Sequence, residues 1–122
     1  MSSVMKAFDE QLIIAFGNAV LKNMGLVGYI AIKLYLKEEK GLRIEDLPNK
    51  TEEFLNGLKE ILGDGVKPIE ETTLQDLCER LKIERNRNLL FEDEIKRLRE
   101  YYLNLLKKLP QFQRTEVITF NY

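Results

Sequence analysis

Apolar residues recur at three- and four-residue intervals along most of the chain, which is the spacing of one face of an α-helix. Glycine and proline interrupt the pattern and divide it into five runs. The pattern therefore predicts an all-α fold, a compact bundle of about five helices that forms a single domain over residues 1–110. The predicted helices cover about residues 7–24, 26–40, 52–62, 68–81 and, from 89 or 91, up to 109.

Five residues are placed to begin or end these helices. Gly25 and Gly41 suit left-handed caps at the ends of the first two helices. Thr51 is expected to cap the start of the third helix, and Gly63 to close it. Pro68 fits the first turn of the fourth helix, where its missing N–H costs nothing.

The first helix is more apolar than one buried stripe requires, because Ile13, Ile14 and Leu21 widen its apolar surface. A helix of this kind is either central in the core or packed on a partner subunit. In the second helix the main apolar face is expected to consist of Val27, Ile30, Ala31, Leu34 and Tyr35, with Ile32 and Leu36 at its flanks. The connector that follows is expected to turn Leu42, Ile44 and Leu47 into the core.

The last helix carries apolar residues at alternating steps of four and three, which is a heptad seam. The seam either packs on the chain's own helices or joins two copies. Beyond Pro110, the tail of residues 111–122 alternates apolar and polar residues and predicts a short extended arm or β-strand. Such an arm either pairs with a second copy or docks on its own domain. The candidate oligomer interface is Phe91, Ile95, Leu98, Tyr102, Leu105, Leu109, Ile118, Phe120 and Tyr122.

Composition narrows the function classes. The 122 residues include 19 basic and 20 acidic side chains, a net charge of −1, which argues against a non-specific nucleic-acid binder. A single cysteine fits a reducing, cytoplasmic compartment. No signal peptide and no run of 18 apolar residues stands out, so no membrane association is expected. Many Glu, Lys and Arg residues hint at a thermophile.

Residues 25–83 resemble a known family. The resemblance rests on Gly25, Ile32, Leu36, Gly41, Glu45-Asp46, Pro48, Phe54, Leu58, Ile61, Gly63-Asp64-Gly65, Ile69-Glu70 and Leu77. In this spacing the segment is similar to the archaeal Nitrosopumilus output domain, which occurs alone and fused to signalling domains. Leu62 and Val66 depart from it, because an aromatic and a small residue are expected there. The resemblance implies an archaeal, cytoplasmic helical module and supplies no catalytic residues.

Side chains suited to catalysis are few. Cys78 lies on the apolar side of its helix and the chain has no histidine to act as its base, so we expect a buried structural thiol. Without Cys and His clusters, no metal or cofactor is expected. Glu70 and Glu71 form either a paired-carboxylate site or ordinary surface. Gly63-Asp64-Gly65 precedes a helix as phosphate loops do, but it lacks their Lys-Ser/Thr and is read as an interhelical turn.

Nucleic-acid binding is the main alternative. The third and fourth helices with their glycine turn could form a helix-turn-helix. Residues 80–108 hold nine basic and five acidic side chains, with the densest cluster at Arg80, Lys82, Arg85 and Arg87. The expected recognition helix, however, carries Glu70, Glu71, Asp76 and Glu79, which would repel phosphates.

The sequence therefore favours a non-enzymatic helical interaction or regulatory module that self-associates, with a dimer favoured, and binds an unknown protein partner. The alternative is a small DNA-binding transcriptional regulator. An enzyme ranks third, and its structural sign would be a pocket that gathers Glu70, Asp76 and a tyrosine.

Overall fold

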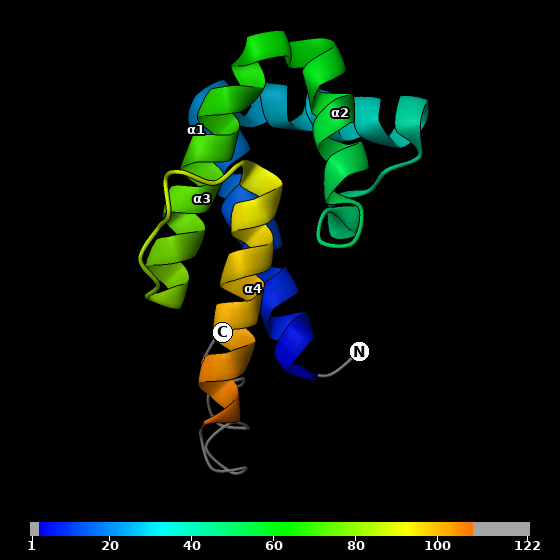
Figure 1. Ribbon diagram of the computed structural model, residues 1–122. Coiled ribbons are helices and arrows are strands. Elements are labelled where there is room, and N and C mark those ends of the chain that lie inside the picture. The colour runs from blue at the N-terminus through cyan, green and yellow to red at the C-terminus, as the bar shows by residue number, and fades with distance from the viewer. Residues whose placement is uncertain (1–2, 109–122) are drawn as a thin grey trace.

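The computed structural model describes residues 3–108. Its elements are α1 (Ser3–Lys40), the 3-10 turn η1 (Ile44–Asp46), α2 (Thr51–Leu62), the 3-10 turn η2 (Gly63–Gly65), α3 (Val66–Leu81) and α4 (Phe91–Lys107) (Figure 1). The all-α class is confirmed, and this part of the chain contains no strand. The count of five helices was wrong, because the first two predicted helices are joined into α1. The predicted arm at 111–122 lies outside the described residues.

The helical backbone of α1 breaks at Gly25, where the sequence predicts the first helix to end. Its backbone has φ 74° and ψ 179°, which is not helical, and helix continues on both sides. A positive φ of this size favours glycine, which explains the residue at the bend. Figure 1 shows the second half of α1, in cyan, leaving the direction of the blue first half. We refer to residues 3–24 as α1a and to residues 26–40 as α1b.

The first half, α1a, is the central helix of the core. Seven of its described apolar side chains are buried, and α3 and α4 pack along it. The ring of Phe16 meets that of Phe54 edge-on, with centroids 5.2 Å apart. From α4, Arg99 lies 2.9 Å from the carboxylate of Asp9 and 5.1 Å from the ring centre of Phe8. The buried residues of α1a include Phe8, Leu12, Phe16, Ala19 and Val20.

The heptad seam of α4 packs on the chain's own helices. Phe91, Ile95, Leu98 and Tyr102 are buried in the core, while Leu105 keeps 45% of its surface exposed. This corrects the expected interface for the four buried residues, because the chain itself already covers them. The other expected interface residues, Leu109, Ile118, Phe120 and Tyr122, lie outside the part of the chain that the structure describes.

Most of the predicted helix ends are confirmed. Gly41 and Gly63 take φ values of 63° and 54° directly after α1 and α2. The exception is Thr51, whose hydroxyl donates to the carbonyl of Leu47 at 2.8 Å instead of accepting from the start of α2. Pro68 lies in the first turn of α3 as expected. The connector residues Leu42, Ile44 and Leu47 are all buried, as predicted.

The apolar content of α1 exceeds what the core uses. By length and composition alone, Lys6–Lys40 is apolar enough to cross a membrane, with a mean hydropathy of 1.4 over an 18-residue window. No run of 18 consecutive apolar residues occurs in this helix, because Asn18, Lys22 and Asn23 interrupt it, and the absence of membrane association stays a prediction. Only 22% of that window is buried. Much of this apolar surface therefore faces outward.

Candidate interaction surface

The helix α1b is apolar on two opposite faces. On the inner face Ile32 and Leu36 are buried, with 3% and 1% of their surfaces exposed. On the opposite side Leu26, Val27, Ile30 and Leu34 expose 64%, 82%, 47% and 52%. Residues 27, 30 and 34 follow the three- and four-residue spacing of a single helix face. We call these four exposed residues the outer face of α1b.

The outer face was the main apolar face expected from the sequence, with Ile32 and Leu36 at its flanks. The structure buries the two flanking residues and leaves Val27, Ile30 and Leu34 exposed. The sequence signal that could have indicated this is the apolar character of the helix on both sides, which exceeds one buried stripe. Periodicity alone could not say which side α2 covers.

The inner face of α1b is held by α2. Gly57 is buried there, and a Cβ built on it would lie 2.8 Å from Cδ2 of Leu36. At the other end, Glu60 accepts a hydrogen bond from the hydroxyl of Tyr35 at 3.0 Å and pairs with Lys40. Hydrogen bonds from Lys40 and Tyr35 lower the pKa of Glu60 below its usual value. Because these contacts fix one side of the helix, the outer face cannot turn inward.

Apolar exposure also continues across the bend. Leu21 and Met24, on the last turn of α1a, expose 41% and 39% of their surfaces. The Met24 side chain lies against Gly28, since Cε of Met24 is 3.5 Å from a Cβ built on that glycine. Contiguous apolar patches of more than a few hundred Å² are rare on monomers and mark docking sites.

Charges of opposite sign border the outer face. From the spacing of an α-helix, Lys33 lies along one edge of the face and Glu38 along the other. Both side chains are exposed. Beyond the lysine edge, Lys33, Lys37 and Arg43 line a shallow depression of about 230 Å³ together with Ile44 and Glu45.

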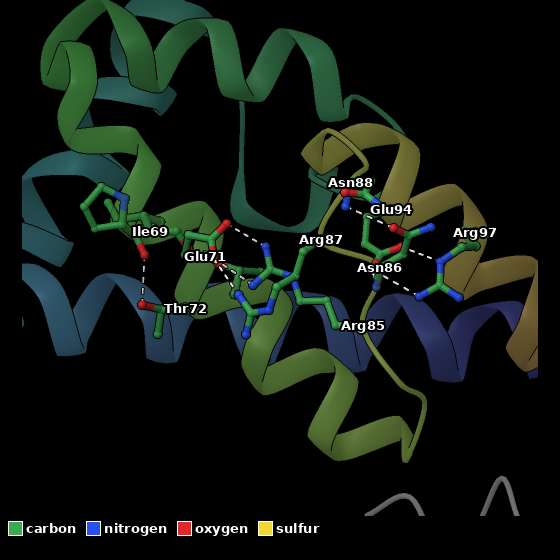
Figure 2. Close-up of polar contacts among 11 residues, drawn as sticks. Ile69, Glu71, Thr72, Arg85, Asn86, Arg87, Asn88, Glu94 and Arg97 are labelled. Atoms are coloured by element: carbon green, nitrogen blue, oxygen red, sulfur yellow. Dashed lines mark hydrogen bonds and ion pairs between the residues drawn. The ribbon is translucent and has the colours of Figure 1, made fainter.

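The predicted basic cluster is largely neutralised within the chain. The guanidinium of Arg85 donates to both carboxylate oxygens of Glu71, at 2.7 and 2.6 Å (Figure 2). Arg87 approaches the same carboxylate at 3.7 Å. The hydrogen bonds from Arg85 hold the pKa of Glu71 below its usual value. One carboxylate of α3 thus holds two of the four cations.

The remaining two cations of the cluster differ from each other. Arg80 donates to the carboxylate of Asp76 at 3.1 Å, one helical turn earlier. Lys82 is exposed and takes a left-handed backbone, φ 58°, where α3 ends. The four residues lie close in sequence, but their charge is not presented as one free basic surface.

The candidate catalytic residues do not converge. A groove of about 720 Å³ between α2, α3 and α4 is lined by Glu70 and the Gly63–Gly65 turn, but by neither Asp76 nor a tyrosine. Burial raises the pKa of Glu70. Cys78 is buried, as expected, and its burial raises the pKa of the thiol. The described residues contain no cluster of His, Cys, Asp and Glu placed to hold a metal.

Comparison of the chain with protein-family models, curated proteins and solved structures finds no match. The family resemblance of residues 25–83 therefore stays a prediction.

Proposed function

We propose that this protein is a non-enzymatic helical interaction or regulatory module that acts through self-association and partner binding, with the outer face of α1b as its binding surface. The observation that carries the proposal is the exposure of Leu26, Val27, Ile30 and Leu34 on a helix whose other side is already covered. Removing apolar surface from water contributes about 25 cal/mol per Å², so covering this face with another molecule is favourable.

The position of α1b supports a binding role over a purely structural one. Ile32 and Leu36, with the half-buried Tyr29 and Tyr35, already supply the core-facing side of the helix. The four apolar residues of the outer face keep 47% to 82% of their surfaces exposed, so they stabilise the isolated fold less than buried side chains do. On a protein surface, such residues reduce solubility unless a partner covers them.

Photo-crosslinking in cells tests this proposal. We would place p-benzoylphenylalanine at Val27 and, separately, at Leu34, and irradiate cells that contain the full chain. Because the outer face is expected to lie against another protein, both positions should give covalent adducts of higher mass. The same probe at Lys96, an exposed position on α4, is the control and should give none. Absence of adducts at both outer-face positions would overturn the proposal.

A DNA-binding regulator is supported less well. Arg80 and Arg85 are hydrogen-bonded to carboxylates, and the solvent side of α3 carries Glu70, Glu71 and Glu79. Phosphate binding would have to break these pairs and overcome the acidic side chains.

A further inference from the structure

We infer that the molecule covering the outer face of α1b is a second copy of this chain, with its own α1b parallel to the first about a two-fold axis. This inference rests on the proposed function and names the partner for the same surface. Two observations support the inference: the charges that border the outer face and the spacing of its exposed residues.

The exposed residues fit the seam of a parallel pair. Val27, Ile30 and Leu34 are separated by three and four residues, as positions a, d and a of a heptad are. Across a parallel two-fold axis each would meet the same residue of the partner. Lys37 follows at the end of this seam, where its long side chain can carry the charge out to water.

The edge charges select the parallel arrangement. In the same register Lys33 takes position g and Glu38 takes position e. In a parallel pair, a residue at g lies beside the residue five positions later in the other helix. Lys33 would therefore meet the partner's Glu38, and by symmetry the contact would form twice. An antiparallel pair would bring the two lysine edges together instead.

The same charges disfavour a lipid surface as the occupant. A helix lying in a membrane interface places cations along both edges of its apolar face, where they meet anionic head groups. Here one edge carries Glu38, which such head groups would repel. A second copy, in contrast, would place an opposite charge beside both Lys33 and Glu38.

Sedimentation equilibrium of the full chain tests whether two copies associate through this face. The wild type should sediment as a species of twice 14.3 kDa. The variant V27E/L34E should be monomeric, or associate at least 100-fold more weakly, because it places four charges in the seam. The matched control is L90E/Y101E, since Leu90 and Tyr101 expose 77% and 51% on other parts of the surface. The control should associate like the wild type; equal weakening would overturn the inference.

Charge exchange tests the orientation. K33E and E38K should each associate roughly tenfold more weakly, because each converts two attractive edge pairs into repulsive ones. An equimolar mixture of the two variants should recover the wild-type affinity, because both edge pairs are then restored. The double variant K33E/E38K should recover it as well. In an antiparallel pair, K33E would instead bind the wild type more strongly than either protein binds itself. That result would assign the antiparallel arrangement.

The remaining outcomes separate this inference from the proposed function. A chain that stays monomeric at high concentration, yet crosslinks to another protein at Val27, retains the binding surface and overturns the second copy. Flotation with phosphatidylserine vesicles tests whether the outer face binds lipid instead. If the wild type is monomeric and floats with the vesicles, and V27E/L34E does not float, the face binds membranes and the second copy is overturned.

Discussion

The carboxylate of Glu94 accepts a hydrogen bond from the backbone N–H of Asn86 at 2.7 Å (Figure 2). Its side chain is fully buried on α4, and Arg97 donates to it at 2.5 and 3.1 Å. Arg97 also donates to the carbonyl of Glu84 at 2.8 Å. Glu94 therefore ties the connector between α3 and α4 to the start of α4. The same connector carries Arg85 to Glu71, so one buried acid helps to place the paired cations.

Replacing Glu94 with alanine should be strongly destabilising. The change leaves the N–H of Asn86 without its acceptor and Arg97 without its counter-ion. Breaking a buried pair costs 3–5 kcal/mol, and because Arg97 is partly exposed we expect a loss of about 2–3 kcal/mol in the free energy of unfolding. Urea denaturation measures it. Glu100→Ala, an exposed acid on the same helix, is the control and should change stability by less than about 0.5 kcal/mol.

The same carboxylate predicts how stability depends on pH. Burial alone would raise the pKa of Glu94, but hydrogen bonds from Arg97 and Asn86 outweigh it, and the pKa lies below the usual 4.5. A pKa that is lower in the folded state adds stability that is complete above pH 4.5 and is lost as the pH falls through the folded value. The free energy of unfolding should therefore fall more steeply below pH 4.5 in the wild type than in Glu94→Gln. Parallel curves for the two proteins would contradict this assignment.

Two glycines inside helices should respond to alanine in opposite directions. In Gly57→Ala the new methyl group would press on buried Leu36, and such overpacking costs about 1–2 kcal/mol. In Gly17→Ala the methyl group would meet no atom within 4 Å, so removing a flexible glycine from α1a should stabilise by about 0.5–1 kcal/mol. Thermal unfolding of the two variants checks both expectations: the Tm should fall in Gly57→Ala and rise in Gly17→Ala. Equal shifts would mean that α2 does not hold the inner face of α1b tightly.

Duplex DNA should not bind at low salt. The cations of the predicted cluster are held by Glu71 and Asp76, so few are free to neutralise phosphates. A titration of labelled duplex DNA in 50 mM salt, followed by fluorescence anisotropy, measures this. Binding that falls with added salt, and is weakened in R85A/R87A, would restore the DNA-binding alternative.

The sequence alone determined the local features of this protein. Helical periodicity placed the helices, and Gly41 and Gly63 marked two of their ends, because backbone conformation at these points depends on the residue itself. Residue type also identified Cys78 as a buried thiol, since its neighbours along the helix are apolar. These features follow from chemistry within a few residues along the chain.

Only the tertiary structure decided which surfaces face water. The helix α1b is apolar on both sides, and the packing of α2 on the side that carries Leu36 is what left Val27, Ile30 and Leu34 outside. The pairs Arg85–Glu71 and Glu94–Asn86 likewise join residues from different elements, so periodicity within one helix could not predict them. An apolar residue favours burial but does not specify its partner. Whether an apolar face of a helix becomes core or binding surface therefore depends on which other helix packs against it.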